Sequence, residues 1–376
     1  MNPAQMNRDD IALAHHWLVG MRGGEKVLEQ FSLLFPGSTI YTLVADVSRL
    51  SAQIAAHPIR SSWLQRIPGS ARQYKKMLPL FPAAVSALRV SEGPRLLLSS
   101  DASVIKGIYS PPDIPHVCYC HSPPRYLWEL QGDYMKSAET AGMIGRLAFR
   151  SVIPYVRRFD QRAAGRVTEF IANSAFVQER IKRCYQRDSV VIHPPVDIES
   201  FDWQRDPEDF YLIVSQLVPY KRIDLAVEAF TRMGRRLVVI GEGPELDNLR
   251  KIAGPSVRFL GSQPFSVLKE HYERCRAFVF PGIEDFGITP LEAQAAGKPV
   301  IALGKGGALE TVIDGSTGLF FPDQTVDSLC EAVLRSDGTS FDPRVMRAQA
   351  ERFSPTAFRQ KISDFLAAKF PDIFRA

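Results

Sequence analysis

Cysteine is scarce in this chain, with only five residues among 376, and nothing in the sequence resembles a disulfide framework. Cys118, Cys120 and His121 are the only residues close enough together to suggest a zinc site. No second pair of ligands follows them, so we predict no metal and no other cofactor. No stretch approaches the ~18 uninterrupted apolar residues of a membrane-spanning helix. The first ten residues are polar, unlike a secretory signal, and we expect a cytoplasmic protein.

Acidic residues are absent from positions 47–91, although the chain as a whole carries a net charge of only +5. Residues 1–200 hold 24 Lys and Arg against 17 Asp and Glu (24 − 17 = +7), whereas the remainder holds 22 against 24 (22 − 24 = −2). Aromatic and apolar residues are interleaved with the cations, a composition typical of a segment that lies on an anionic membrane. The cations of the acid-free segment are Arg49, Arg60, Arg66, Arg72, Lys75, Lys76 and Arg89. A second basic stretch, in which Asp160 is the one acidic residue, contains Arg146, Arg150, Arg157, Arg158, Arg162 and Arg166.

We therefore predict a peripheral protein on the inner face of the cytoplasmic membrane. A solvated basic face over an ordinary core remains the alternative. Nucleic acid is not expected as a partner, because no RNA-binding signature accompanies the charge.

Short apolar runs alternate with amphipathic helical patterns over nearly the whole length, which predicts an α/β protein with two Rossmann-like domains in series. A Pro- and Asp-rich stretch over 194–207 predicts the boundary. We expect an N-terminal acceptor-side domain over 1–204, a nucleotide-sugar-binding domain over 205–354, and a helix in 355–376 that packs back on the first domain. The predicted strands are 11–15, 39–43, 95–99, 116–120, 169–173, 190–193, 211–215, 237–241, 257–260, 277–280 and 299–302.

The glycine pattern of a dinucleotide-binding fold is missing. Neither the segment 16–25 nor Gly241-Glu-Gly243 has the G-x-G-x-x-G spacing, and no Walker lysine loop is present. A nicotinamide enzyme and a P-loop nucleotidase are therefore not expected.

The most informative segment is 278–300, in which a buried strand, a loop and a helix follow one another. The loop carries Glu284, and we predict that the helix begins at Pro290 with Thr289 as N-cap and Glu292 closing a capping box. A loop that leads into a helix at the carboxyl end of a parallel strand suits a phosphate or diphosphate. Carboxylates on either side could bind the hydroxyls of a sugar and a ribose.

Glu284 and Glu292 form an E-x₇-E pattern that resembles the hallmark of retaining glycosyltransferases of family 4. The segments 212–224, 239–244, 257–261 and 306–318 resemble that family in the same order, as do 23–26, 120–128, 173–174 and 191–197 in the first half. Of the second group, 120–128, 173–174 and 191–197 are similar to bacterial mannosyltransferases of O-antigen and exopolysaccharide assembly, whereas 23–26 resembles the glycine-rich loop of the whole family. The resemblance implies the GT-B fold, in which two Rossmann-like domains face a central cleft.

The resemblance also implies roles for individual residues. Glu284 and His121 would be the catalytic residues, with Glu284 on the donor-sugar hydroxyls and His121 near the reaction centre. Donor binding would involve Gly23, Gly24, Lys221, Arg222, Phe286, Gly287, Ile288 and Glu292, and Arg125 and Tyr126 would lie on the acceptor side. Lys221 would neutralise the diphosphate. One departure is Gln216, where the family usually has an Arg; Arg222 or Arg125 would compensate.

These roles imply metal-independent transfer of a sugar with retention of configuration, most simply mannose from GDP-mannose onto a lipid-linked saccharide in lipopolysaccharide or exopolysaccharide biosynthesis. Two alternatives stay open. The donor sugar could be rhamnose, glucose or galactose, or the chain could be a non-catalytic nucleotide-sugar-binding subunit of a polysaccharide assembly complex.

Overall fold

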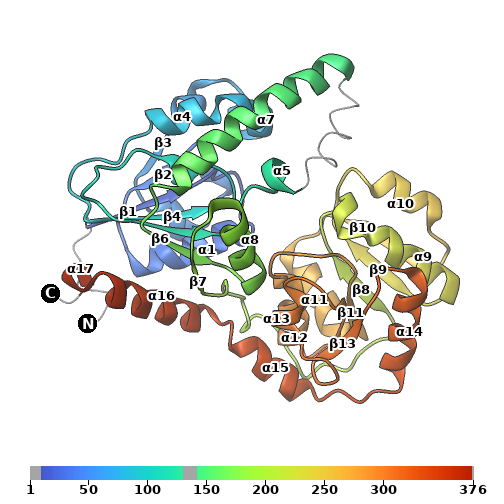
Figure 1. Cartoon of the computed structure of the whole chain (residues 1–376). Helices are drawn as coiled ribbons and strands as arrows, with labels where there is room; N and C mark the ends of the chain where they lie inside the picture. The colour runs from blue at the N-terminus through green and yellow to red at the C-terminus, as the bar shows by residue number, and fades with distance from the viewer. Residues whose placement is uncertain (1–9, 130–141, 375–376) are drawn as a thin grey trace. The chain divides into compact units, whose positions relative to one another are not determined.

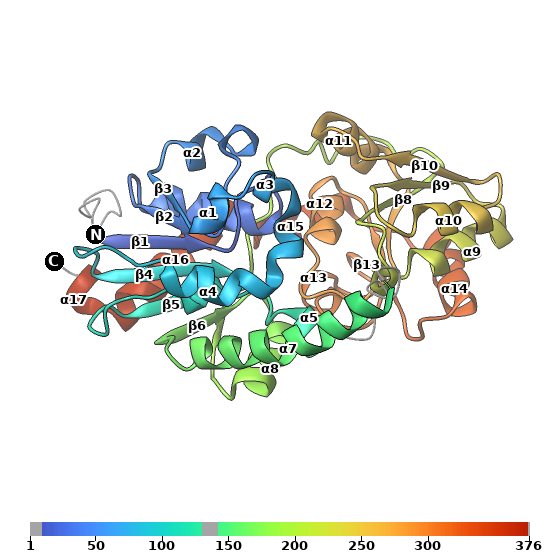
Figure 2. The same cartoon turned by 90° about the horizontal axis from the view of Figure 1, so that it is seen from above.

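A computed structural model describes residues 10–129 and 142–374, with side chains omitted over 142–151. The chain divides into two compact units, one formed by 1–195 together with 358–376 and the other by 196–357. Each unit contains one wholly parallel sheet with helices on both faces (Figures 1 and 2). The predicted α/β class with two Rossmann-like domains is confirmed.

Unit 1 has a seven-stranded sheet in the order β3-β2-β1-β4-β5-β6-β7. Its strands are β1 (Ile11–His15), β2 (Ile40–Thr42), β3 (Ile59–Ser61), β4 (Leu96–Asp101), β5 (His116–Cys120), β6 (Glu169–Ala172) and β7 (Val190–Val191). Its α-helices are α1 (Gly23–Leu34), α2 (Ala52–Ala55), α3 (Ser70–Gln73), α4 (Phe81–Ala87), α5 (Arg125–Trp128), α7 (Gly142–Ala164), α8 (Ala175–Tyr185) and α17 (Pro371–Phe374), with 3₁₀ turns η2 (Val47–Arg49), η3 (Trp63–Arg66), η4 (Tyr74–Leu80) and η5 (Ile105–Gly107).

Unit 2 has a six-stranded sheet in the order β10-β9-β8-β11-β12-β13. The strands are β8 (Tyr211–Val214), β9 (Leu237–Ile240), β10 (Val257–Gly261), β11 (Ala277–Phe280), β12 (Val300–Leu303) and β13 (Gly318–Phe321). The helices are η6 (Pro219–Lys221), α9 (Ile223–Met233), α10 (Leu246–Ile252), α11 (Phe265–Arg274), α12 (Ile288–Ala295), α13 (Ala308–Thr311), α14 (Val326–Asp337) and α15 (Pro343–Glu351). The sequence prediction missed β3 and β13.

The central strands β1, β4, β5, β11 and β12 are buried on both faces, which is why they read as continuous apolar runs. In β1, Ile11 and Leu13 pack into one layer of unit 1, whereas Ala12 and Ala14 pack into the other. The first of these layers also contains Phe358, Ile362 and Leu366 of the C-terminal helix α16 (Pro355–Lys369). This helix, red in Figure 1, therefore supplies part of the core of unit 1 although it follows unit 2 in the chain.

Each sheet reverses its strand order once. In unit 1 the chain builds β2 and β3 on one side of β1 and then places β4 on the other side. In unit 2 the same reversal lies between β8 and β11. The carboxyl ends of the two strands that flank such a reversal are where open α/β sheets bind ligands.

Candidate functional site

The first candidate site lies at the strand reversal of unit 2. Lys221 follows β8 and Glu284 follows β11, and the Lys221 ammonium forms an ion pair with the Glu284 carboxylate. Both side chains are largely buried, with 14% and 21% of their surface exposed. The structure thus brings together the two residues that the sequence assigned to diphosphate and donor sugar, and it shows them neutralising each other.

The loop that carries Glu284 is held by the turn at Gly306-Gly307, to which the sequence analysis assigned no role in the site. The Gly307 N–H donates to the Glu284 carbonyl at 2.9 Å. A Cβ on Gly307 would lie 2.3 Å from the Phe286 Cα, so only glycine allows this approach. The Gly306-Gly307 pair in the sequence was the signal that could have revealed it.

The predicted start of helix α12 is wrong. The helix begins at Ile288, and Gly287, at φ 94°, is its N-cap without any side-chain cap. Thr289 therefore lies inside the first turn, and no capping box involves Glu292. Glycine in the left-handed region reverses the chain directly before Ile288. The first N–H groups of the helix, which have no acceptor within it, begin directly after Phe286 and Gly287.

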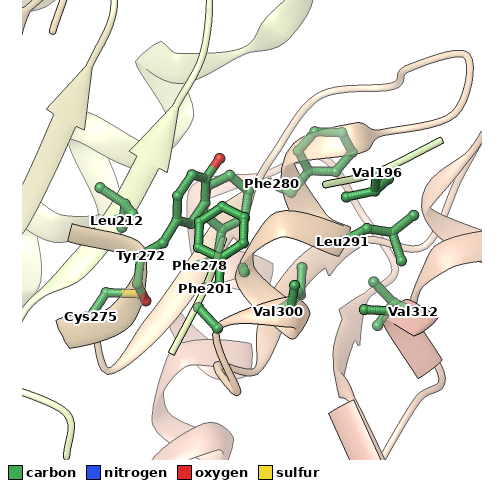
Figure 3. Packing of buried hydrophobic residues seen from close by; sticks show 14 of the residues in the cluster. Val196, Phe201, Leu212, Tyr272, Cys275, Phe278, Phe280, Leu291, Val300 and Val312 are labelled. Carbon is green, nitrogen blue, oxygen red and sulfur yellow. The ribbon is translucent and has the colours of Figure 1, made fainter. Parts of the chain in front are cut away.

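Glu292 has a different partner, which the sequence did not indicate. Its Oε2 accepts a hydrogen bond of 2.9 Å from the hydroxyl of Tyr272 on α11. Tyr272 is 1% exposed, and its ring packs in the core beside Phe278 (Figure 3). Burial, followed by the nearby Glu292 carboxylate, raises the Tyr272 pKa well above its ordinary value, so the hydroxyl stays a donor. Tyr272 holds the Glu292 carboxylate in place.

If Glu292 binds the ribose of a nucleotide sugar, as the family resemblance implies, replacing Tyr272 with phenylalanine should weaken that binding about tenfold, because a hydrogen bond to a charged group contributes roughly 1.5–3 kcal/mol. Isothermal titration calorimetry measures this loss. Tyr211→Phe is the matched control, since the buried Tyr211 hydroxyl also donates to a carboxylate, that of Asp337 at 3.1 Å. Equal affinities for the two variants would contradict a role for Tyr272 at the donor site.

Arg222 is engaged elsewhere in unit 2. Its Nε lies 3.1 Å from an Asp224 carboxylate oxygen, and its Nη1 donates to Gln324 Oε1 at 3.4 Å. Gln324 in turn donates to the Pro281 carbonyl at 3.0 Å. Gln216, which stands where the family usually has an Arg, is exposed. Of the two arginines that were expected to compensate for Gln216, Arg222 is thus already paired with Asp224.

The second candidate site lies at the strand reversal of unit 1. His121 follows β5, and its Nε2 lies 2.7 Å from the Ser100 hydroxyl on β4. His15, the last residue of β1, places its Nδ1 3.1 Å from the same hydroxyl. Gly24, in the first turn of α1, packs against these rings, since a Cβ there would lie 3.3 Å from His15 Cε1 and 3.6 Å from His121 Nε2. The structure therefore brings together His121 and Gly24 of the predicted site.

Three buried charges lie beneath the segment that carries His121, Arg125 and Tyr126. Lys106 pairs with Asp101 at 3.1 Å and with Asp160 at 2.5 Å, and all three side chains are at most 1% exposed. Burial disfavours the charged ammonium, but the two carboxylates hold the Lys106 pKa well above its usual range. Asp160, which the sequence suggested as a counter-charge on a basic face, is instead a buried partner of Lys106.

This buried triad is tied to the 121–128 segment. The Asp101 carbonyl accepts from the His121 N–H at 2.9 Å, and Asp160 accepts from the Trp128 indole at 3.0 Å. The Tyr126 hydroxyl shares a hydrogen bond of 2.9 Å with Ser103, whose N–H donates to Asp101. Tyr126 is therefore anchored inside unit 1. Among residues 10–129 and 142–374, no group of three or more His, Cys, Asp and Glu side chains could hold a metal ion.

Comparison with known proteins adds family and fold. The "Glycosyltransferase Family 4" model matches residues 44–200, and the "Glycosyl transferases group 1" model matches 195–336. A GDP-mannose-dependent alpha-(1-6)-phosphatidylinositol monomannoside mannosyltransferase of Mycobacterium tuberculosis is 38% identical over 43% of this chain and 46% of its own length. A D-inositol 3-phosphate glycosyltransferase of Mycobacteroides abscessus is 26% identical over 56% of each chain. The chain thus spans about half the length of these curated relatives.

Solved structures extend the likeness over nearly the whole chain. HepE of Anabaena, in complex with UDP and glucose, superimposes with a TM-score of 0.69 at 18% identity, over 95% of this chain and 99% of HepE. The lipopolysaccharide outer core galactosyltransferase WaaB, in its apo form, gives a TM-score of 0.65 at 17% identity, over 96% and 99%. At such identities the likeness concerns the fold. Since the two family models together match residues 44–336, the chain belongs to the glycosyltransferases of the GT-B fold, with a family 4 domain followed by a group 1 domain.

Proposed function

We propose that this protein is a retaining mannosyltransferase that moves mannose from GDP-mannose onto a lipid-linked saccharide, in the biosynthesis of a cell-surface polysaccharide or lipopolysaccharide. The observation that carries the proposal is the juxtaposition of Lys221 and Glu284 at the strand reversal of unit 2, next to the N-terminus of α12. A cation and the N-terminal N–H groups of a helix suit a diphosphate, and a carboxylate suits sugar hydroxyls. The mycobacterial relative is a GDP-mannose-dependent mannosyltransferase, which supports GDP-mannose as donor.

In this proposal, Lys221 and the N–H groups of Phe286, Gly287 and Ile288 stabilise the negative charge that grows on the leaving diphosphate. Glu284 binds hydroxyls of the donor sugar, and Glu292, held by Tyr272, accepts from the ribose hydroxyls. The bond from the anomeric carbon to the phosphate oxygen breaks while the bond to the acceptor oxygen forms on the same face. The acceptor's proton passes to the leaving phosphate, so the step needs no metal and no protein base.

The ion pair between Lys221 and Glu284 has a consequence for donor binding. A diphosphate and a sugar hydroxyl offer each of the two side chains a new partner of suitable charge. Binding therefore exchanges one ion pair for two sets of charge-assisted hydrogen bonds. The exposed fractions of 14% and 21% show that both side chains are already largely out of water before the donor binds, so the exchange adds little further desolvation cost.

A panel of nucleotide sugars tests the donor directly. GDP-mannose at a hundred times its dissociation constant should stabilise the protein by about 2.7 kcal/mol, seen as a raised Tm in differential scanning fluorimetry. UDP-glucose, UDP-galactose and dTDP-rhamnose serve as controls. Stabilisation by one of these and not by GDP-mannose would contradict the proposed donor. Stabilisation by GDP-mannose without any transfer would favour a non-catalytic binding subunit.

The membrane part of the proposal rests on the acid-free segment of unit 1. Its seven cations are exposed, as are Trp63 at 39% and Leu80 at 40%. Other apolar residues of the segment, among them Leu64 and Tyr74, are part of the core. In the second basic stretch Arg157 donates to the Leu127 carbonyl and Arg166 to that of Gly107. Arg158 and Arg162 are exposed, and the side chains of Arg146 and Arg150 lie outside the described residues.

We infer that unit 1 contacts anionic lipid on the inner face of the cytoplasmic membrane through this segment. Among the described helices, none is both long and apolar enough to cross a bilayer.

Reversing two of these charges, Lys75→Glu with Lys76→Glu, should lower binding to vesicles that contain phosphatidylglycerol at least about thirtyfold, at ~1 kcal/mol for each cation lost. Sedimentation with the vesicles measures the bound fraction. The matched control, Arg250→Glu with Lys251→Glu, changes charge equally on the exposed α10 of unit 2. Equal binding to neutral and anionic vesicles would contradict the membrane surface.

A further inference from the structure

One hydroxyl connects two histidines at the strand reversal of unit 1. Ser100 Oγ lies 2.7 Å from His121 Nε2 and 3.1 Å from His15 Nδ1. The three residues come from β4, the loop after β5 and β1, which are neighbours in the sheet. Ser100 and His15 have no exposed surface, so water does not compete for these hydrogen bonds. The hydroxyl has a single proton, which it can donate to only one of the two rings.

The surroundings of His15 decide the direction of the two hydrogen bonds. His15 Nε2 is buried and has no hydrogen-bond partner among the described residues. Burial, with His16 and His121 adding to it, lowers the His15 pKa well below its ordinary value, so the ring is neutral and carries one proton. If Ser100 donated to His15 Nδ1, the ring proton of His15 would have to sit on Nε2. There it would form a buried N–H without an acceptor. Such groups are rarer than buried acceptors that lack a donor.

The favoured arrangement therefore has the His15 proton on Nδ1, where it is donated to Ser100. Ser100 then donates its own proton to His121 Nε2. Because Nε2 accepts, the proton of a neutral His121 must sit on Nδ1. A second proton on His121 would reverse both hydrogen bonds and leave the unsatisfied N–H on His15.

We propose that Ser100 is a positioning residue: its hydroxyl, oriented by His15, keeps Nε2 of His121 as an acceptor and the ring proton of His121 on Nδ1. With Nε2 fixed as an acceptor, a hydrogen bond that His121 donates to an oxygen of the donor sugar or phosphate would come from Nδ1. The role in transfer rests on the proposed function, whereas the position of the proton does not.

The position of the proton can be measured without any ligand. In protein labelled with ¹⁵N-histidine, long-range ¹H–¹⁵N spectra distinguish a pyrrole-type from a pyridine-type ring nitrogen, and His121→Gln assigns the signal among the seven histidines. We expect a pyridine-type Nε2 and a pyrrole-type Nδ1 for His121. In Ser100→Ala the hydroxyl is lost, and the proton should move to Nε2, the usual tautomer in water. Ser100→Thr keeps the hydroxyl and should restore the original pattern.

Transfer kinetics supply the second readout. Ser100→Ala should lower kcat by roughly 10–100-fold, as removal of the outer partners of metal-binding histidines does, with the KM for the donor nearly unchanged. Ser99→Ala is the matched control, because the neighbouring hydroxyl is equally buried but bonds His116 Nε2 at 2.8 Å. It should change neither the His121 signal nor kcat.

A pyrrole-type Nε2 on His121 in the unmodified protein would overturn the proposal, and this result does not depend on any variant folding. An unchanged His121 signal in a folded Ser100→Ala variant would overturn it as well. If the spectra agree but the unmodified protein transfers no sugar from any donor, the proposed function fails while the assignment of the proton stands.

Discussion

Glu284→Ala should lower the rate of sugar transfer by about 10²–10³-fold, the loss typical for one preorganised hydrogen-bonding group at a reaction centre. Glu284→Gln should lose nearly as much, because the amide keeps the shape of the side chain but not the charge that pairs with Lys221. Both changes remove the negative charge that pairs with Lys221, so affinity for the bare nucleoside diphosphate should rise or stay constant while turnover falls. Steady-state kinetics with a radiolabelled donor, together with calorimetry of GDP binding, separate the two effects.

The control for this experiment is Glu208→Ala. Glu208 also pairs with a cation of unit 2, Arg274, but this pair is about half exposed. Its two residues precede β8 and β11, whereas Lys221 and Glu284 follow these strands. Its loss should leave turnover unchanged. If Glu284→Ala retained full turnover, Glu284 would not be a catalytic residue.

Lys106→Met should destabilise unit 1 by about 3–5 kcal/mol, the range for removing one partner of a buried ion pair. Methionine fills a similar volume but leaves Asp101 and Asp160 facing each other without a cation. Urea unfolding followed by tryptophan fluorescence measures the change, since the Trp128 indole donates to Asp160 and reports on this region. Adding Asp101→Asn and Asp160→Asn should recover most of the loss, because the triple variant contains no uncompensated charge.

The destabilisation should shrink as the pH falls. Without Lys106 the two buried carboxyls would have pKa values above those of the unfolded chain. The folded variant would then bind protons more readily than the unfolded one, so its stability rises toward acid pH. Lys298→Met is the control, because the buried Lys298 of unit 2 donates to the Arg205 backbone carbonyl. If Lys298→Met lowered the free energy of unfolding as much as Lys106→Met, the loss could not be attributed to the uncompensated carboxylates.

Much of the fold could be predicted from sequence because strands buried on both faces leave continuous apolar runs, as in Ile11–His15, His116–Cys120 and Ala277–Phe280. The two missed strands are short: Ile59–Ser61 lies in a polar, basic context, and Gly318–Phe321 begins with glycine. The start of α12 was misplaced because Thr289-Pro290-x-Glu292 has the spacing of a capping box, although the helix begins one residue before Thr289. What decides it is the left-handed conformation of Gly287, which depends on the loop around it.

The site was less accessible to sequence reasoning because its supporting contacts connect distant residues. Ser100 reaches back 85 residues to His15, and Asp160 meets Lys106 from a different helix. The ring of Tyr272 is part of the core, and only its hydroxyl contacts Glu292, a contact that the sequence pattern does not indicate. The roles of Glu284, His121 and their neighbours come from the family resemblance and stay predictions until the variants above are tested.

The place of α16 in the core of unit 1 has a consequence for synthesis on the ribosome. Unit 2 is continuous in sequence, so all of its residues have emerged before Phe358, Ile362 and Leu366 leave the exit tunnel. Unit 1 begins first but cannot complete its apolar layer until those side chains arrive, so the face of its sheet that α16 covers stays exposed in the nascent chain. Domains that are synthesised first generally fold first; here the N-terminal unit should be the last to reach its final stability.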